Sequence, residues 1–334
     1  MQRTHAPLLF ALGLIFPLLG CLRANDLWVV YEGGDGPGKG KHIVLVSGDD
    51  EYRSEEALPQ LGKILAVRHG FKCTVLFPID PETGAITPDH QTNIPGLESL
   101  DDADMMVISL RFRELPDSQM KHFVDYTNSG KPILGLRTST HAFNYTRNKK
   151  SPYAKYDFRS KEWPGGFGQQ VLGDTWIDHH GHHKREAARG LVNGLYQEHP
   201  ILRGVEDVFG ETDVYGVKNL GPDAQILLWG QVLLGMKPDD GAKFTKSIMP
   251  LFWTKGFTGT SGKTARIICT TMGASIDLKS EGLRRALVNS CYWGLAMEDQ
   301  IEEEANVDIV GKFEPTFYGF GTFKKGVKPL QHKL

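Results

Sequence analysis

The sequence predicts an α/β protein built on an open, mostly parallel sheet with helices on both of its faces. Short, continuous apolar runs rich in β-branched residues, such as 41–47 (KHIVLVS), are typical of strands that are buried on both faces. Segments with apolar residues at helical spacing alternate with these runs. Such alternation is typical of βαβ units, whose strands lie parallel to one another.

In the first half of the chain, the predicted elements are two helices and four strands. The helices cover 54–69 and 117–129, and the strands cover 41–47, 71–77, 104–110 and 131–136. Leu58, Leu61 and Leu65 form one apolar stripe on the first helix, and Gly130 follows the second helix at a position that favours its end. Residues 144–168 are rich in Lys, Tyr, Pro and Gly without periodicity, which predicts a long surface insertion.

The second half adds three predicted strands and a strong helix. The strands cover 224–234, 247–253 and 264–270, and the helix covers 281–297, where Leu283 and Leu287 begin an apolar repeat of four residues. Residues 306–334 are punctuated by glycine and predict a tail extended over the surface. The predicted organisation is therefore an α/β domain over 25–305 followed by this tail.

The N-terminus has the order of a secretory signal peptide over 1–24. Arg3 precedes an apolar run at 6–20, which is interrupted by proline and too short for a spanning helix. Two processing sites are possible. The signal could be cleaved after Ala24, or residues 18–21 could act as a bacterial lipobox, in which case Cys21 would be lipidated. Either way we expect export to the periplasm or beyond, without a transmembrane anchor.

Composition narrows the classes of partner. The chain has 38 basic and 40 acidic residues, and this near balance does not favour nucleic acid as a partner. The cysteines downstream of Cys21 are Cys73, Cys269 and Cys291, an odd number in apolar contexts. They are expected to be small buried side chains and not a disulfide framework.

Charged and polar residues follow three of the predicted strands, at the end where parallel sheets bind ligands. From these we expect catalytic roles for Asp49, Glu51, Arg137 and His141. The expected substrate-binding residues of the same loops are Asp50, Arg53, Arg111, Arg113 and Thr138. The alternatives are ordinary solvated loops and, for Arg137, an internal salt bridge to one of the carboxylates at 49–51.

Residues 178–183 form the densest histidine run of the chain. Alternate residues of an extended segment share a face, which pairs His180 with His182, and His179 with His183. The prediction places a divalent metal such as zinc on His180 and His182, with a third ligand from His141, Asp178 or Asp213. The alternatives are metal-free acid–base work, with His180 as a catalytic group, and a polar surface loop.

Residues 132–143 (PILGLRTSTHAF) resemble the strand–turn–helix elbow of class I glutamine amidotransferases. Further segments, 42–54, 199–204, 213–215 and 273–293, resemble the ThuA-like (trehalose utilisation) family, in an exported bacterial subgroup. The resemblance implies the glutamine amidotransferase-like fold with flavodoxin-like winding, and adds Asp213 and Tyr215 to the expected substrate contacts. Arg137 stands where the amidotransferases keep cysteine and the ThuA-like family usually has histidine, and Ala274 stands where many members have histidine.

An arginine stays protonated and cannot attack a carbonyl, so glutaminase activity by a cysteine route is not expected. An arginine can hold an anionic or polyhydroxylated ligand. The resemblance implies a carbohydrate-related enzyme whose substrate is a sugar or keto-sugar derivative. The strand-end carboxylates and histidines would supply its acid–base groups, as in an isomerase or hydrolase. Two alternatives stay open, a non-catalytic carbohydrate-binding or scaffold protein and a metal-dependent hydrolase centred on the cluster at 179–183.

Overall fold

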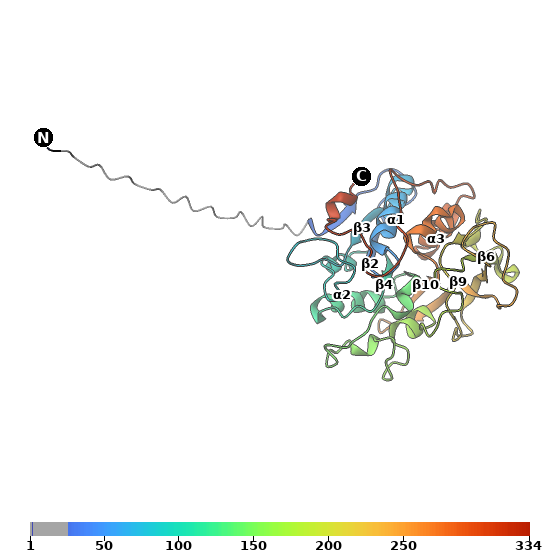
Figure 1. The fold of residues 1–334 in the computed structure, drawn as a ribbon, viewed down its shortest axis with the longest axis horizontal. Coiled ribbons are helices and arrows are strands. Elements are labelled where there is room, and N and C mark those ends of the chain that lie inside the picture. The colour runs from blue at the N-terminus through green and yellow to red at the C-terminus, as the bar shows by residue number, and fades with distance from the viewer. Residues whose placement is uncertain (1, 3–25) are drawn as a thin grey trace.

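A computed structural model describes residue 2 and residues 26–334, so the expected signal peptide and Cys21 lie outside the described residues. Within 26–334 one sheet of ten strands runs through the molecule (Figure 1). Its strands in chain order are β1 (Trp28–Tyr31), β2 (His42–Gly48), β3 (Lys72–Leu76), β4 (Met105–Leu110), β5 (Ile133–Leu136), β6 (Ala188–Val192), β7 (Phe209–Gly210), β8 (Gln225–Val232), β9 (Met249–Thr258) and β10 (Thr264–Thr270). The α-helices of this region are α1 (Ser54–His69), α2 (Asp117–Asn128) and α3 (Glu281–Gly294).

The five central strands are parallel, in the spatial order β3-β2-β4-β5-β10. Counted along the chain this is the flavodoxin-like order 2-1-3-4-5. The predicted parallel sheet is therefore confirmed for the centre of the molecule. The remaining strands pair antiparallel, β1 at one edge and β9, β8, β6 and β7 at the other. The sequence pattern does not indicate β1, β6 or β7, because these strands are short and partly exposed.

Helices cover both faces of the central strands, as the sequence predicts. Along β2, Ile43 and Leu45 pack into one core with α1 and α3, while Val44 and Val46 pack into the other core with α2. Figure 1 shows α1 and α3 on one side of the sheet and α2 on the other. The continuous apolar run of β2 follows from this arrangement, since both faces of the strand must be buried.

The segment 144–168 differs from its prediction as a surface insertion. It has little regular structure, yet Tyr145, Tyr156, Phe158 and Phe167 are buried. The ring of Phe167 lies 5.2 Å from the ring of Phe123 in α2, measured between centroids. The segment is rich in lysine and glycine, but its buried aromatic residues extend the core beside α2.

The C-terminal tail crosses the molecule and is tied to it by hydrogen bonds. The Tyr31 hydroxyl donates to the carbonyl of His332 at 2.7 Å, and the N–H of Gly319 donates to the carbonyl of Glu51 at 2.9 Å. The tail therefore reaches the loop that follows β2, at the carboxyl edge of the sheet. Tyr318 is buried there, so the tail does more than lie on the surface as predicted.

The sequence predicts that the three cysteines of the described region are small buried side chains. Cys73, Cys269 and Cys291 are buried and unpaired, as predicted.

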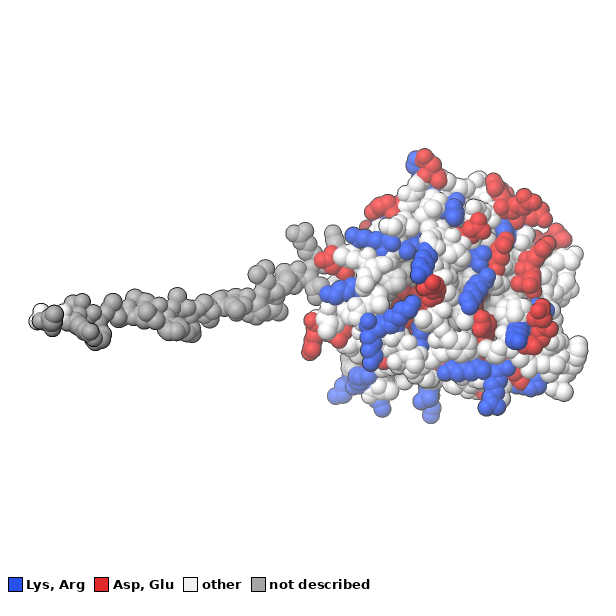
Figure 2. All heavy atoms as spheres, turned by 45° about the horizontal axis from the view of Figure 1, so that its top comes forward, with Lys and Arg blue, Asp and Glu red and all other residues white. Residues whose placement is uncertain are grey.

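Figure 2 shows basic and acidic side chains interspersed over much of the face it presents. Over the residues that the structure describes, no helix is both long enough and apolar enough to cross a bilayer.

Candidate functional site

A pocket of about 200 Å³ lies at the carboxyl ends of β2, β4 and β5. The residues that line it come from three strand ends, from the segment 176–215 and from the tail: Glu51, Tyr52, Arg111, Arg137, Thr138, His141, Trp176, His179, His183, Tyr215 and Phe320. A larger cleft of about 820 Å³ lies beside the start of α3 and contains none of the predicted site residues. The smaller pocket is therefore the candidate site, since predicted residues from separate strand ends meet there.

The backbone is strained at three places around this edge of the sheet. Arg53, Phe112 and Arg137 have φ values of 62°, 50° and 46°, in the left-handed region that costs a non-glycine residue roughly 1–2 kcal/mol. They follow β2, β4 and β5 respectively. At Arg137 the turn is held because its N–H donates to Met272 and its carbonyl accepts from the Tyr215 hydroxyl. Strain of this kind collects at functional sites, where the surrounding structure maintains it.

Arg137 forms the floor of the pocket and is almost completely buried. Its guanidinium donates to Asp213 Oδ1 at 2.9 Å, to the Tyr52 hydroxyl at 3.0 Å and to the carbonyls of Thr271 and Asp213. Burial alone would lower the pKa of Arg137, but Tyr52 and Asp213 raise it well above its ordinary value. The salt bridge anticipated as an alternative does exist, but its partner is Asp213 and not a carboxylate of the β2 loop.

Asp213 joins Arg137 to the histidine run. Its Oδ2 lies 3.0 Å from Nδ1 of His179, and its Oδ1 lies 3.2 Å from Nδ1 of His183. Burial by itself would raise the pKa of Asp213, but Arg137 and the two imidazoles outweigh burial and hold the pKa well below its usual value. Asp213 is therefore a buried carboxylate that stays ionised.

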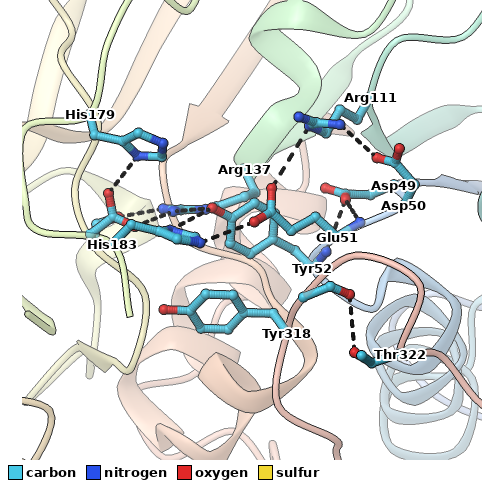
Figure 3. Close-up of polar contacts among 12 residues, drawn as sticks. Asp49, Asp50, Glu51, Tyr52, Arg111, Arg137, His179, His183, Tyr318 and Thr322 are labelled. Atoms are coloured by element: carbon cyan, nitrogen blue, oxygen red, sulfur yellow. Dashed lines mark hydrogen bonds and ion pairs between the residues drawn. The ribbon is translucent and has the colours of Figure 1, made fainter. Parts of the chain in front are cut away.

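His183 lies between two carboxylates (Figure 3). Its Nδ1 contacts Asp213, and its Nε2 lies 3.1 Å from Oε1 of Glu51. These hydrogen bonds, first that of Asp213 and then that of Glu51, raise the pKa of His183 to about 9. Glu51 and Asp213 thus create a strongly negative environment at one wall of the pocket.

His180 and His182 do not take part in this cluster. The ring of His180 is half-buried and its Nε2 lies 2.7 Å from the carbonyl of Ser247, while His182 is exposed. The N–H groups of His180 and Gly181 both donate to the carbonyl of Val214, so the run turns here and does not continue as a strand. The strand alternation that pairs His180 with His182 therefore does not apply, and the fold brings His179 and His183 to the pocket.

His141 faces the pocket as a buried imidazole. Its ring lies between the rings of Phe112 and Trp176, with centroids 5.1 and 5.2 Å away. Burial, followed by the positive charge of Arg111, lowers the pKa of His141 well below its ordinary value. Its Nδ1 is buried without a hydrogen-bond partner among the described residues. His141 is therefore a neutral histidine with unused hydrogen-bonding capacity.

Arg111 lines the pocket and is paired with Asp50, which does not line it. NH1 of Arg111 donates to Asp50 Oδ1 at 2.9 Å, and its Nε lies 3.9 Å from Glu51 Oε2. The guanidinium also lies 4.3 Å from the ring centroid of Phe112 and 4.8 Å from that of Phe320. These contacts fix Arg111 beside Glu51 at the pocket.

Other predicted residues support the loops and do not line the pocket. Asp49 accepts the N–H groups of Glu51 and Tyr52, at 2.7 and 2.9 Å, and the Thr138 hydroxyl. Arg113 donates to main-chain carbonyls, and Arg53 donates to the tail at Gly319 and Thr322. The side chains of these residues form hydrogen bonds within the protein and are not available to a ligand. A charged residue after a strand is therefore not necessarily one that faces the pocket.

Sequence reasoning missed four aromatic residues at the site: Tyr52, Trp176, Tyr318 and Phe320. Tyr318 stacks on Tyr52 with ring centroids 5.0 Å apart, while Trp176 and Phe320 line the pocket directly. The sequence does indicate a place for Tyr52 near the site, because Tyr52 lies within the charged cluster that follows the first strand. The tail motif FYGFG also combines aromatic residues with glycine, but nothing local indicates where the tail docks.

No family model and no curated protein matches the chain. Among solved structures, it is similar to proteins described as ThuA-like from Parabacteroides merdae (15% identity, TM-score 0.48) and Bacteroides uniformis (14%, 0.44). The matches cover 77% and 79% of this chain and 90% and 94% of those chains. A glutaminase domain of Trypanosoma brucei CTPS is also similar, at 8% identity and a TM-score of 0.35, covering 81% of this chain and 98% of that one.

Proposed function

We propose that the protein is an enzyme that binds a small sugar or keto-sugar derivative in this pocket and acts on it by proton transfer. The observation that carries the proposal is the combination of aromatic rings with convergent polar groups around one small cavity. Trp176 and Phe320 offer apolar surfaces on which the face of a sugar ring can pack. Glu51, Arg111 and His141 offer the donors and acceptors that hydroxyl and carbonyl groups need.

The size of the cavity favours a single sugar unit. Its volume of about 200 Å³ is below the roughly 300–1,000 Å³ of pockets that hold drug-sized ligands. The resemblance of the sequence to the ThuA-like family points to the same substrate class. A longer saccharide would have to extend past the exposed ring of Phe320 at the rim.

Two groups are suited to proton transfer. Glu51 supplies a carboxylate from the loop after β2, and His141 supplies a neutral imidazole from the loop after β5. None of the lining residues is a serine or cysteine, and the hydroxyl of Thr138 is already donated to Asp49. These observations disfavour a covalent intermediate on serine, cysteine or threonine. Proton transfer, as in keto-sugar isomerisation, is the chemistry that Glu51 and His141 are placed to carry out.

The test follows hydrogen exchange between solvent and substrate. The purified protein is incubated in D₂O with ketohexoses, aldohexoses and oxidised disaccharides, and deuterium incorporation at carbon is followed by NMR. Glu51→Gln and His141→Gln should each lower the exchange rate about 100-fold or more, because a positioned acid–base group contributes roughly 10²–10⁴-fold. His180→Ala is the matched control outside the pocket and should retain the rate.

Each other outcome has a defined meaning. Sugar binding without exchange or turnover would replace the enzyme by a carbohydrate-binding protein, the alternative that the sequence leaves open. Exchange that survives both substitutions would remove Glu51 and His141 from the mechanism. Absence of binding to any of these sugars would reject the substrate class.

We also propose that the protein is exported. The proposal is supported by Arg3 and the apolar run at 6–20, which have the order of a signal peptide. The position of the mature N-terminus tests it, as set out in the Discussion.

A further inference from the structure

We propose that His179, His183 and Asp213 bind a divalent transition-metal ion at one wall of the pocket. Each of these residues offers one ligand atom, and the three atoms lie within 4.8 Å of one another. The histidines come from the turn at 179–183, and Asp213 comes from the segment that follows β7. The isolated bridge between His179 and Tyr215 holds the two segments side by side.

The spacing of the atoms suits an ion. Nδ1 of His179 lies 3.0 Å from Asp213 Oδ2, and Nδ1 of His183 lies 3.2 Å from Asp213 Oδ1. With metal–ligand bonds of about 2.1 Å, neighbouring ligand atoms are separated by about 3.0 Å in an octahedron and about 3.4 Å in a tetrahedron. The two contacts run to different oxygens of Asp213, and the three ligand atoms lie within 4.8 Å of one another, so adjustment of the side chains would bring them around one ion.

The groups behind the three ligands match the outer shell of a metal site. A histidine ligand usually bonds through its second ring nitrogen to a carboxylate, and Glu51 lies 3.1 Å from Nε2 of His183. NH2 of Arg137 donates to Asp213 Oδ1 at 2.9 Å and thereby orients that carboxylate. Asp50, Glu51 and Asp213 carry three negative charges against the two positive charges of Arg111 and Arg137, so the local balance favours a cation.

The ligand set also indicates the class of metal and the kind of site. Two imidazoles and one carboxylate suit zinc, iron(II) and related first-row ions. His179 and His183 line the pocket, so positions not taken by protein can face a ligand or water. Such an ion would act as a Lewis acid on a substrate oxygen. That role rests on the proposed function, whereas metal binding itself does not.

The test measures metal without any substrate. Full-length mature protein is stripped with EDTA and titrated with Zn²⁺ by calorimetry, and Co²⁺ is added separately to follow its visible absorption. Tight binding of a single Zn²⁺ is expected. His179→Ala and His183→Gln should each weaken it at least 100-fold, and Glu51→Gln should weaken it about 10- to 100-fold as an outer-shell change. Thermal melting of each metal-free variant checks that it remains folded.

His180→Ala and His182→Ala are the matched controls, because they change histidines of the same run that lie outside the pocket. Both should bind Zn²⁺ like the wild type. Loss of binding in these variants with retention in His179→Ala would overturn the assignment, and so would a wild-type protein that binds neither Zn²⁺ nor Co²⁺. Sugar turnover by the metal-stripped protein would reject the Lewis-acid role of the ion and keep the proposed function. Zn²⁺ binding by a protein that turns over none of the sugars would keep the metal site and reject the proposed function.

Discussion

The guanidinium of Arg137 and the carboxylate of Asp213 form an ion pair of 2.9 Å at the floor of the pocket, with side-chain exposures of 2% and 0%. The pair joins the turn after β5 to the segment after β7. A buried pair of this kind is costly to break, because removal of one partner leaves an uncompensated charge in the interior. It links the stability of the fold to the position of the histidines, since Asp213 also contacts His179 and His183.

Arg137→Met should lower the free energy of unfolding by about 3–5 kcal/mol, because Asp213 would remain buried and ionised without its main partner. The double variant Arg137→Met/Asp213→Leu should lose less, because it removes both charges. Urea unfolding of the single and double variants measures the difference. Equal stability of wild type and Arg137→Met would show that the pair does not hold the fold.

The buried carboxyl group of Glu55 should make the free energy of unfolding depend on pH. It is buried, neither carboxylate oxygen has a hydrogen-bond partner among the described residues, and burial raises its pKa to about 8. Because the folded pKa lies above the unfolded value of about 4.3, its contribution to stability is complete below pH 4.3. That contribution is lost as the pH rises towards 8, by up to about 1.4 kcal/mol per pH unit within this window.

The comparison of wild type with Glu55→Gln isolates this group, because glutamine does not ionise. The variant should gain stability over the wild type between pH 5 and pH 8, with the gain largest at the upper end. Urea unfolding at both pH values measures it. A stability difference that stays constant with pH would mean that Glu55 does not titrate in this range.

Phe320→Ala should weaken sugar binding by about 0.5–1.5 kcal/mol, roughly 2- to 10-fold, because an aromatic wall of the pocket is lost. The side chain is 55% exposed, so the melting temperature should change little. Phe317→Ala is the matched control, since Phe317 lies in the same tail, is 42% exposed and does not line the pocket. Calorimetric titration with a sugar that binds the wild type measures the affinity of both variants. An equal loss of affinity in Phe320→Ala and Phe317→Ala would indicate a general loosening of the tail and contradict the prediction.

The mature protein should begin at Cys21 or at Asn25, because the apolar run at 6–20 has the order of a signal and is too short for an anchor. Intact mass spectrometry of protein from the native host measures the N-terminus. An acylated Cys21 would establish the lipoprotein route, and a free Asn25 the secreted route. Residues 1–20 retained on the native protein would contradict export by this signal.

The sequence predicted local structure closely where one pattern dominates. Helix 54–69 has the bounds of α1, and strand 264–270 those of β10. Apolar stripes and a helix-ending glycine act within a few residues of each other, so they can be recognised without knowledge of the fold. The strands that were missed, β1, β6 and β7, are edge or near-edge strands whose partly exposed side chains weaken the pattern.

For the site, the sequence by itself determined that Glu51, Arg111, Arg137 and His141 follow buried parallel strands, and the geometry of a parallel sheet then brings them to one edge. Only the tertiary structure decided their partners. Arg137 meets Asp213 across 76 residues, and Arg53 meets Gly319 across 266. The choice of His179 and His183 over His180 depends on a turn fixed by Val214. Contacts of this range depend on strand order and on where loops and the tail dock, whereas periodicity carries information only between near neighbours.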